Sequence, residues 1–281
     1  MDERKDLVAP VQGGEIRGWI TGAGEPVLML HGGPGMGYEY LDAITEELPG
    51  FTVASFQQRG LAPSTTGGPF TARQAVDDVL AVLDALGWQK PVIIGHSWGG
   101  HLALRVAALH PGRTRGVLAI DPLGVVGDGG MEAFDDEMDA RLPAAVRERA
   151  QRIAAREDEG TATLAESTEA VRLYWPAYFA EPAAAPPPGE IRISSEAFAG
   201  IMGSLGEEAA LVVERLARGE VTYLILSGAS SPMPWGASGM ASAEISPQGG
   251  LEVVQGAGHF LWLEAPGAVQ RALGRLLEAA A

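Results

Sequence analysis

Residues 95–99 of this 281-residue chain read Gly-His-Ser-Trp-Gly and set a serine hydroxyl between two glycines. The apolar residues 91–94 precede them, and the helix-compatible residues 100–109 follow. A serine on a sharp turn from strand to helix forms a nucleophile elbow, in which the glycines leave room for a strained backbone. The same pattern also arises by chance in a glycine-rich chain, but its strand and helix context favours the elbow. Ser97 is therefore predicted to be a catalytic nucleophile.

A serine hydroxyl is a weak nucleophile at neutral pH and needs an adjacent base that accepts its proton. His259 stands in a loop of small residues directly after the strand-like residues 251–254, late in the chain. A surface histidine without a catalytic role is the alternative. The other four histidines lie within the glycine-rich motifs or close to the helix expected after Ser97: His31, His96, His101 and His110. We therefore expect His259 to be the base.

A glycine-rich loop, residues 31–35 (His-Gly-Gly-Pro-Gly), follows the apolar residues 27–30. Glycines let backbone N–H groups approach a ligand closely, which suits an oxyanion hole. In hydrolases with a nucleophile elbow, one donor is the N–H of the residue after the nucleophile, here Trp98, and the other comes from an early loop. Gly33 is the candidate for this second donor. A phosphate cradle is the alternative, but the Gly-Lys-Ser/Thr signature is missing.

The HGGPG and GHSWGG motifs resemble those of the proline iminopeptidase branch of the α/β-hydrolases, as do residues 56–64 and 258–266. That branch usually reads Asp-Gln-Arg-Gly-x-Gly-x-Ser, whereas this chain has Gln57 in place of the Asp and Ala62 in place of the second Gly. The resemblance covers the chain outside its middle third. It implies an α/β fold, with a mostly parallel, doubly wound sheet and a helical cap insertion.

The acid that would orient His259 departs from the family pattern. Relatives carry Gly-x-x-Asp after the penultimate strand, but residues 228–231 read Gly-Ala-Ser-Ser, so Ser231 stands at the acid position. A serine cannot hold an imidazolium charge as a carboxylate does. Asp121 directly follows a strand expected beside the nucleophile strand, and some relatives, such as haloalkane dehalogenases, resemble this in carrying their acid there. We predict Asp121 as the acid, with Asp128 as second choice; a Ser–His dyad, or Asp121 as a simple turn residue, are the alternatives.

The chain is long enough for one large core with an insertion. Alternating strand and helix patterns predict a parallel sheet with helices on both faces. Residues 1–126 and 218–281 are expected to form the two parts of the α/β-hydrolase core. Residues 127–217 show helical patterns and Pro/Ala linkers without a clear strand, and are predicted to form the cap.

Composition narrows the classes of function. A net charge of −16 with dispersed basic residues disfavours nucleic-acid and anionic-membrane partners. The absence of cysteine excludes disulfides and thiolate chemistry. A charged N-terminus and the lack of a membrane-length apolar run predict a cytoplasmic protein. Histidine spacing and the lack of nucleotide fingerprints predict neither a metal nor a cofactor.

The substrate is expected to be a small, largely apolar molecule. The residues predicted to line its site are Met36, Tyr38, Leu123, Trp175 and Phe260. The alternative is that the aromatic residues among them belong to the core.

The first function predicted is a serine hydrolase of esters, lactones or amides that works through an acyl-enzyme. The alternatives are an aminopeptidase of the proline iminopeptidase type and a non-catalytic ligand-binding protein on a hydrolase scaffold. An aminopeptidase needs a cap carboxylate for the substrate ammonium, and the sequence offers Glu169, Glu181 and Glu196. The sequence does not indicate an oligomeric state.

Overall fold

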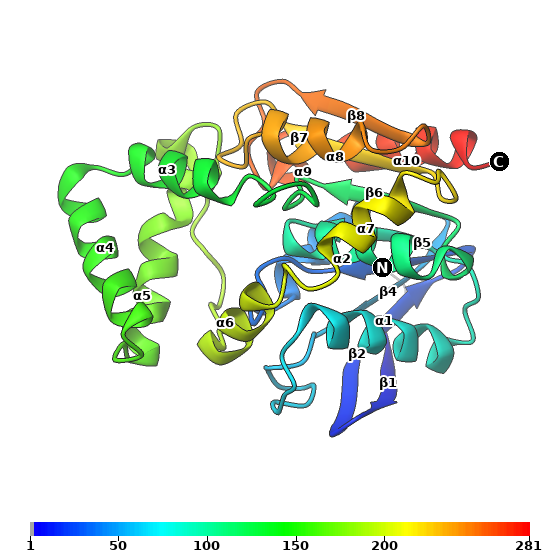
Figure 1. The fold of residues 1–281 in the computed structure, drawn as a ribbon, viewed down its shortest axis with the longest axis horizontal. Helices are drawn as coiled ribbons and strands as arrows, with labels where there is room; N and C mark the ends of the chain where they lie inside the picture. The colour runs from blue at the N-terminus through cyan, green and yellow to red at the C-terminus, as the bar shows by residue number, and fades with distance from the viewer. Residues whose placement is uncertain (1–2) are drawn as a thin grey trace.

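The computed structural model describes residues 3–281, within which eight strands form one sheet in the order β1-β2-β4-β3-β5-β6-β7-β8. The first two strands run antiparallel at one edge, and β3 to β8 are parallel (Figure 1). The strand bounds are β1 Lys5–Val11, β2 Gly14–Gly22, β3 Glu25–Leu30, β4 Phe51–Phe56, β5 Val92–His96, β6 Gly116–Ile120, β7 Tyr223–Gly228 and β8 Gly249–Val254. This is the predicted fold class, an α/β-hydrolase fold.

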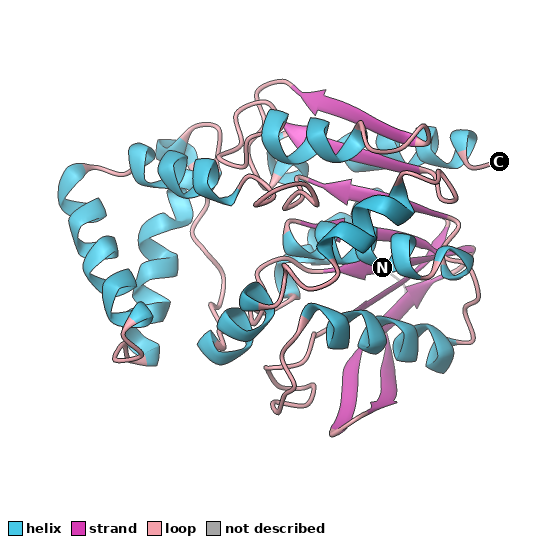
Figure 2. Ribbon diagram, viewed as in Figure 1, coloured by secondary structure: helices cyan, strands magenta, loops and turns pink. Residues whose placement is uncertain are grey.

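Helices cover both faces of the sheet, which explains the continuous apolar runs of the central strands. Side chains alternate along β3, so that Leu28 packs with the cluster under α1, α2 and α7, whereas Val27 packs with the cluster under α10. Figure 2 shows these two helical layers on either side of the strands. The helices are α1 Ala72–Leu86, α2 Trp98–Leu109, α7 Ala209–Leu216, α8 Ala241–Ala243, α9 Leu261–Glu264 and α10 Ala268–Ala279, with short turns η1 Glu39–Glu47, η2 Pro111–Arg113 and η5 Gly236–Met240.

The middle of the chain is helical, as expected, but it divides into two parts. The helices α3 Met131–Arg141, α4 Ala144–Asp158 and α5 Leu164–Tyr174 form a unit that projects beyond the sheet (Figure 1), here named the helical lobe. The turns η3 Trp175–Tyr178 and η4 Pro182–Ala184 and the helix α6 Ser195–Gly203 lead back from it.

The end of the predicted cap segment returns to the core. Ile201 of α6 and both Val212 and Leu216 of α7 are buried in the hydrophobic cluster that includes α2. The sequence could not show this, because an amphipathic helix has the same pattern whether it covers a sheet or a cap. None of the helices among residues 3–281 is long and apolar enough to cross a membrane.

Candidate active site

The turn from β5 to α2 holds Ser97 in a strained conformation, with φ 54° and ψ −122°. A residue with a Cβ rarely adopts this region, and a surrounding structure must hold it there. A Cβ on Gly95 would lie 2.1 Å from the Gly99 carbonyl oxygen, so the turn demands glycine. The Ser97 N–H also donates to the carbonyl of Ile120 (2.9 Å), which ties the elbow to β6.

His259 and Asp121 meet although 138 residues separate them. His259 Nδ1 lies 2.5 Å from Asp121 Oδ2, and both side chains are buried. Since Nδ1 carries the proton for this bond, Nε2 is left as a base. The ring centroid of His259 lies 4.5 Å from that of His96, the residue before Ser97, so the pair sits beside the elbow. Ser97 and His259, both among the described residues, are not joined by a hydrogen bond, and the distance between such catalytic groups often shortens only in the reacting complex.

Asp121 owes its position to the sheet. It directly follows β6, which pairs with β5 on one side and β7 on the other. Its own N–H donates to the Leu226 carbonyl (2.7 Å), and its φ of 42° turns the side chain out of the strand direction. The N–H of Gly228 donates to Oδ1 (3.1 Å), so β7 also fixes the carboxylate.

Ser231, at the position where relatives carry the acid, contacts Asp121 directly. Its hydroxyl donates to Asp121 Oδ2, the oxygen that His259 also contacts, and accepts from the N–H of Met233 (3.0 Å). No local sequence pattern indicates this contact, because it depends on which of the two neighbouring strand ends carries the carboxylate. A donor therefore stands where a carboxylate would, and the carboxylate comes from the neighbouring strand.

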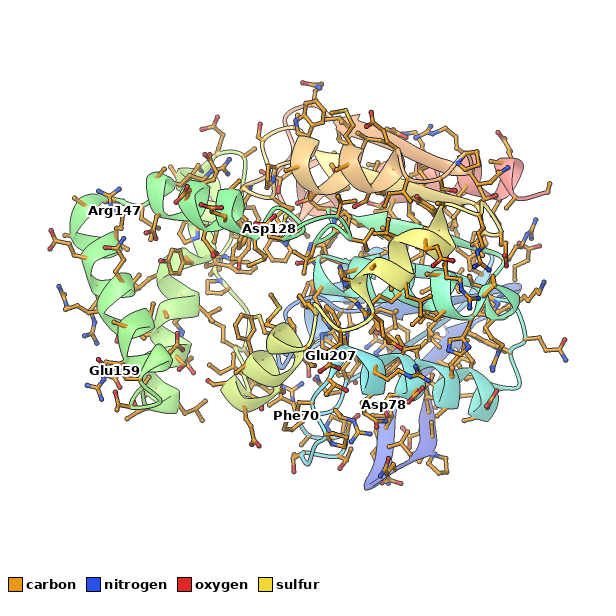
Figure 3. The ribbon with its side chains drawn as sticks, in the orientation of Figure 1. Phe70, Asp78, Asp128, Arg147, Glu159 and Glu207 are labelled. Atoms are coloured by element: carbon orange, nitrogen blue, oxygen red, sulfur yellow. The ribbon has the colours of Figure 1, made fainter. Side chains whose placement is uncertain are left out.

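Asp128, the second choice for the acid, is engaged elsewhere. Its carboxylate accepts from the N–H groups of Gly130 (3.0 Å) and Glu132 (2.9 Å), and it is exposed where the chain enters α3 (Figure 3). These backbone bonds lower the pKa of Asp128. Asp128 thus stabilises the first turn of α3, and the structure does not support it as the partner of His259.

Burial controls the electrostatics of the pair. It lowers the pKa of His259, which favours the neutral imidazole that a base requires. It raises the pKa of Asp121, while the bonds from Ser231 and Gly228 act in the opposite direction. Because both side chains are buried, solvent does not screen the attraction between the Asp121 carboxylate and a positive charge on the His259 ring.

The loop with the candidate oxyanion donor passes directly over the elbow. A Cβ on Gly32 would lie 2.8 Å from the Ser97 Cβ. Gly33 has a φ of 54°, and its carbonyl accepts from the Met36 N–H (2.8 Å), which closes a tight turn. The N–H of Gly33 and that of Trp98, at the first position of α2, donate to no protein acceptor within residues 3–281. Both therefore remain candidates for an oxyanion hole.

Gln58 connects this loop to the elbow by hydrogen bonds, a role that the sequence did not predict. Its side-chain amide donates to the His31 carbonyl (2.8 Å), while its amide oxygen accepts from Trp98 Nε1 (2.9 Å). The backbone N–H of Gln58 also donates to His31 Nε2 (3.0 Å). Gln57, where relatives have Asp, donates to the Met36 carbonyl and accepts from Arg192 (2.9 Å each).

The predicted substrate-lining residues do not share one environment. Met36 lies against Gly33, and the N–H of Leu123 donates to the Ser97 carbonyl (3.2 Å), so both adjoin the proposed site. Tyr38 is half-buried, with its ring centroid 6.5 Å from that of His31. Trp175 and Phe260 pack against each other, 4.9 Å between centroids, in a core cluster. Substrate contact stays a prediction for all five.

Two aromatic residues contributed by the middle segment reach His259. Tyr178 of η3 stacks on its ring at 5.2 Å, and the Phe134 ring of α3 lies 6.3 Å away. The backbone carbonyl of Tyr178 also accepts from the His259 N–H (2.8 Å). Of the candidate cap carboxylates, Glu169 is paired with Arg149 (2.7 Å), whereas Glu181 and Glu196 are exposed. Among the side chains that the structure describes, no cluster of three or more His, Cys, Asp or Glu could hold a metal ion.

The fold and this arrangement agree with the family comparison. A family model described as alpha/beta hydrolase fold matches residues 25–266. The chain therefore belongs to the α/β-hydrolase family.

Individual similarities are more distant. A serine hydrolase-like protein of Danio rerio is 36% identical over 121 residues, which are 41% of this chain and 37% of that protein. The matched stretch is thus little more than a third of that relative. The crystal structure of VinJ superposes with a TM-score of 0.74 at 23% identity over 99% of each chain. A proline iminopeptidase of Mycobacterium smegmatis gives 0.68 at 22% over 98% of this chain and 99% of the other. At such identities these two structures show the fold alone.

Proposed function

We propose that the chain is a cofactor-independent serine hydrolase that cleaves an ester, lactone or amide bond of a small, largely apolar substrate. Ser97 is the nucleophile, His259 the general base and acid, and Asp121 the orienting carboxylate. The N–H groups of Gly33 and Trp98 form the oxyanion hole.

In this mechanism the Ser97 oxygen attacks the substrate carbonyl carbon while His259 Nε2 takes the hydroxyl proton. The oxyanion accepts hydrogen bonds from the two N–H groups, each typically worth about 10²–10³ in rate. Collapse of the tetrahedral intermediate breaks the bond to the leaving group, which receives the proton from His259. Water then repeats the sequence on the acyl-enzyme and releases the acid and free Ser97.

One observation carries the proposal: the buried contact of 2.5 Å between His259 Nδ1 and Asp121 Oδ2 beside the strained elbow. Burial of two ionisable groups is unfavourable unless they are paired, so a core without catalytic demands gains little by keeping them. The ring orientation that this bond sets also leaves Nε2 available for Ser97.

Labelling with a fluorophosphonate tests the nucleophile. The wild-type protein should be labelled on Ser97, as peptide mass spectrometry would show, and Ser97→Ala should not react. Ser55→Ala is a matched control, because Ser55 is buried in β4 and its hydroxyl has no hydrogen-bond partner. Undiminished labelling of Ser97→Ala, or a wild-type protein that binds small ligands without reacting, would instead support the non-catalytic reading.

An aminopeptidase of the proline iminopeptidase type is the second candidate, and the acidic α3 favours it. Asp135 directly follows Phe134, which lies near His259. Partial burial and the carboxylates of Asp139 and Asp136 raise the pKa of Asp135, which indicates a negative potential suited to a substrate ammonium. Turnover of a prolyl anilide is compared with turnover of an aryl ester of similar size. A higher kcat/KM for the anilide, lowered by Asp135→Asn, would support this candidate over the first.

A further inference from the structure

A chain of buried and partly buried hydrogen bonds links three segments of the proposed site. Tyr40, in η1, accepts from the Gly32 N–H at 2.6 Å, and its hydroxyl lies 2.8 Å from His96 Nδ1. His96 Nε2 in turn lies 3.1 Å from the His259 carbonyl oxygen. His96 is 2% exposed, and its ring is packed between those of Tyr40, His259 and Trp262. The proposed mechanism uses neither Tyr40 nor His96.

The direction of each bond follows from the number of protons. The Gly32 N–H can only donate, so the Tyr40 oxygen accepts there and its single proton is free for His96 Nδ1. His96 Nδ1 is then an acceptor, its proton sits on Nε2, and Nε2–H donates to the His259 carbonyl. A single neutral tautomer of His96 satisfies all three contacts. Burial and the neighbouring His259 ring also lower the pKa of His96, in agreement with a neutral ring.

We propose that Tyr40 and His96 are positioning residues that hold the oxyanion loop, the elbow and the base loop in mutual register. This inference rests on the proposed function of Ser97. Gly32 gives its N–H to Tyr40, so the next N–H, that of Gly33, is the one left free for the oxyanion. At the other end of this hydrogen-bond chain, His96 Nε2 fixes the backbone of His259, whose side chain must reach Ser97. His96 is itself the residue before Ser97, so all three segments share this one connection.

The expected consequence concerns rate more than binding. The two residues act through Gly32 and His259, and a misplacement of about 1 Å in a reacting group can cost about 10²-fold. Tyr40→Phe keeps the ring and removes the hydroxyl. Tyr223→Phe is the matched control, since Tyr223 is 1% exposed and its hydroxyl donates to the Ser242 carbonyl (2.8 Å) far from Ser97 in the sheet. Tyr40→Phe loses the bonds to Gly32 and His96, whereas Tyr223→Phe loses one buried bond, so the urea midpoint should fall further in Tyr40→Phe while both variants stay folded in the activity assay.

For a small aryl ester, Tyr40→Phe should lower kcat about 10–100-fold with KM changed less than threefold, and should slow fluorophosphonate labelling by a similar factor. Tyr223→Phe should change neither more than twofold. A kcat for Tyr40→Phe equal to that of Tyr223→Phe would overturn the positioning role.

Substitutions of His96 test separately its hydrogen bond with Tyr40 and its hydrogen bond with His259. In His96→Asn the amide oxygen replaces the Nδ1 acceptor for Tyr40, whereas in His96→Gln the amide nitrogen replaces the Nε2 donor to His259. Each should recover at least threefold in kcat over His96→Ala. If His96→Ala does not fold, the Asn and Gln variants are compared with wild type and should each lose about 3–30-fold, less than expected for complete disorder of either loop. Asn and Gln variants as slow as Ala, or as fast as wild type, would overturn the proposal.

Labelling of Ser97→Ala distinguishes a failure of the proposed function from a failure of the positioning role. Loss of labelling in Ser97→Ala, together with Tyr40→Phe behaving as Tyr223→Phe, would overturn the positioning role alone. Retained labelling in Ser97→Ala would overturn the proposed function and the positioning role with it.

Discussion

The region around Ser97 and the helical lobe differ in the interactions that hold them together. Around Ser97, polar groups such as Asp121 and His96 are buried and held by several hydrogen bonds each. The hydrophobic cluster between the lobe and η3 is small, with Met138, Leu142 and Ala150 of the lobe and Ala177 of η3 buried. Its ion pairs, such as Arg149–Glu169, are largely exposed and contribute little to stability. A site held by many hydrogen bonds keeps the reacting groups in place, whereas a lobe with few buried contacts can change and so alter which substrates are accepted.

The largest effect that this comparison predicts comes from Asp121. Asp121→Asn keeps the shape of the side chain but cannot stabilise an imidazolium, a change that costs about 10⁴ in kcat in a serine protease. We expect kcat/KM on the best ester to fall about 10³–10⁴-fold. Thermal unfolding should show that the variant is folded. Asp128→Asn is the matched control at the entrance to the lobe and should change kcat/KM less than threefold; the opposite ranking would exclude Asp121 as the acid.

The same contrast explains what the sequence predicted. The elbow could be predicted from the sequence, because a strand, a turn and a helix have local signatures. The placement of Asp121 could be predicted because neighbouring parallel strands end at one edge of the sheet. The contact of Tyr40 with His96, 56 residues apart, and that of Ser231 with Asp121 depend on tertiary packing and have no local pattern. The return of α7 to the core was missed for a related reason, since burial against α2 and burial in a cap give the same periodicity.

Removal of the α4–α5 hairpin should alter selectivity more than folding. Tyr174 Oη donates to Asp139 Oδ1 (2.6 Å), and Arg141 Nη1 donates to the Ala177 carbonyl (3.0 Å), so the two ends of the hairpin lie close together. A Gly/Ser linker of about six residues in place of residues 143–173 can span them and leaves α3 and α7 intact.

We expect this deletion to lower kcat/KM for a small ester about tenfold and to raise the ratio of bulky to small ester turnover by a similar factor, since a lobe that covered the site would limit substrate size. Glu169→Gln, which only breaks the ion pair with Arg149, should leave the ratio within twofold. An unchanged ratio in the deletion would show that the hairpin does not shape the substrate site.

Acid should destabilise the core through its buried histidines. Burial lowers the pKa of His101 from 6.5 to about 4, and its Nδ1 contacts the Gly124 carbonyl (2.9 Å). Because the folded pKa lies below the unfolded value, its contribution to stability is complete above pH 6.5 and is lost as the pH falls toward 4. One such proton gives a slope of about 1.4 kcal/mol per pH unit, a tenfold change in the folding equilibrium constant.

His101→Asn keeps a donor for the Gly124 carbonyl and removes the titration. Urea unfolding between pH 6.5 and 5 should show a slope of the unfolding free energy that is shallower than in wild type by about 1 kcal/mol per pH unit on average, because the unfolded histidine is only half protonated at pH 6.5. His110→Asn should change the slope less, because His110 is only half-buried. Equal slopes in wild type and His101→Asn would mean that the pKa of His101 is the same in the folded and the unfolded protein.

The smallest effect should come from Ser231, the residue at the position of the family's usual acid. Ser231→Ala removes one donor to Asp121 Oδ2, but the carboxylate keeps the Gly228 N–H on Oδ1 and the contact with His259. We therefore expect kcat/KM to fall less than tenfold, since a hydrogen bond to a charged group contributes about 1.5–3 kcal/mol and only part of that loss is specific to the transition state. A double-mutant cycle decides how Ser231 acts. If it acts through Asp121, Ser231→Ala should cost nothing further in an Asp121→Asn background. An additive loss would mean that Ser231 contributes independently of Asp121, and a loss in Ser231→Ala as large as that in Asp121→Asn would return the family's usual acid position to the centre of the mechanism.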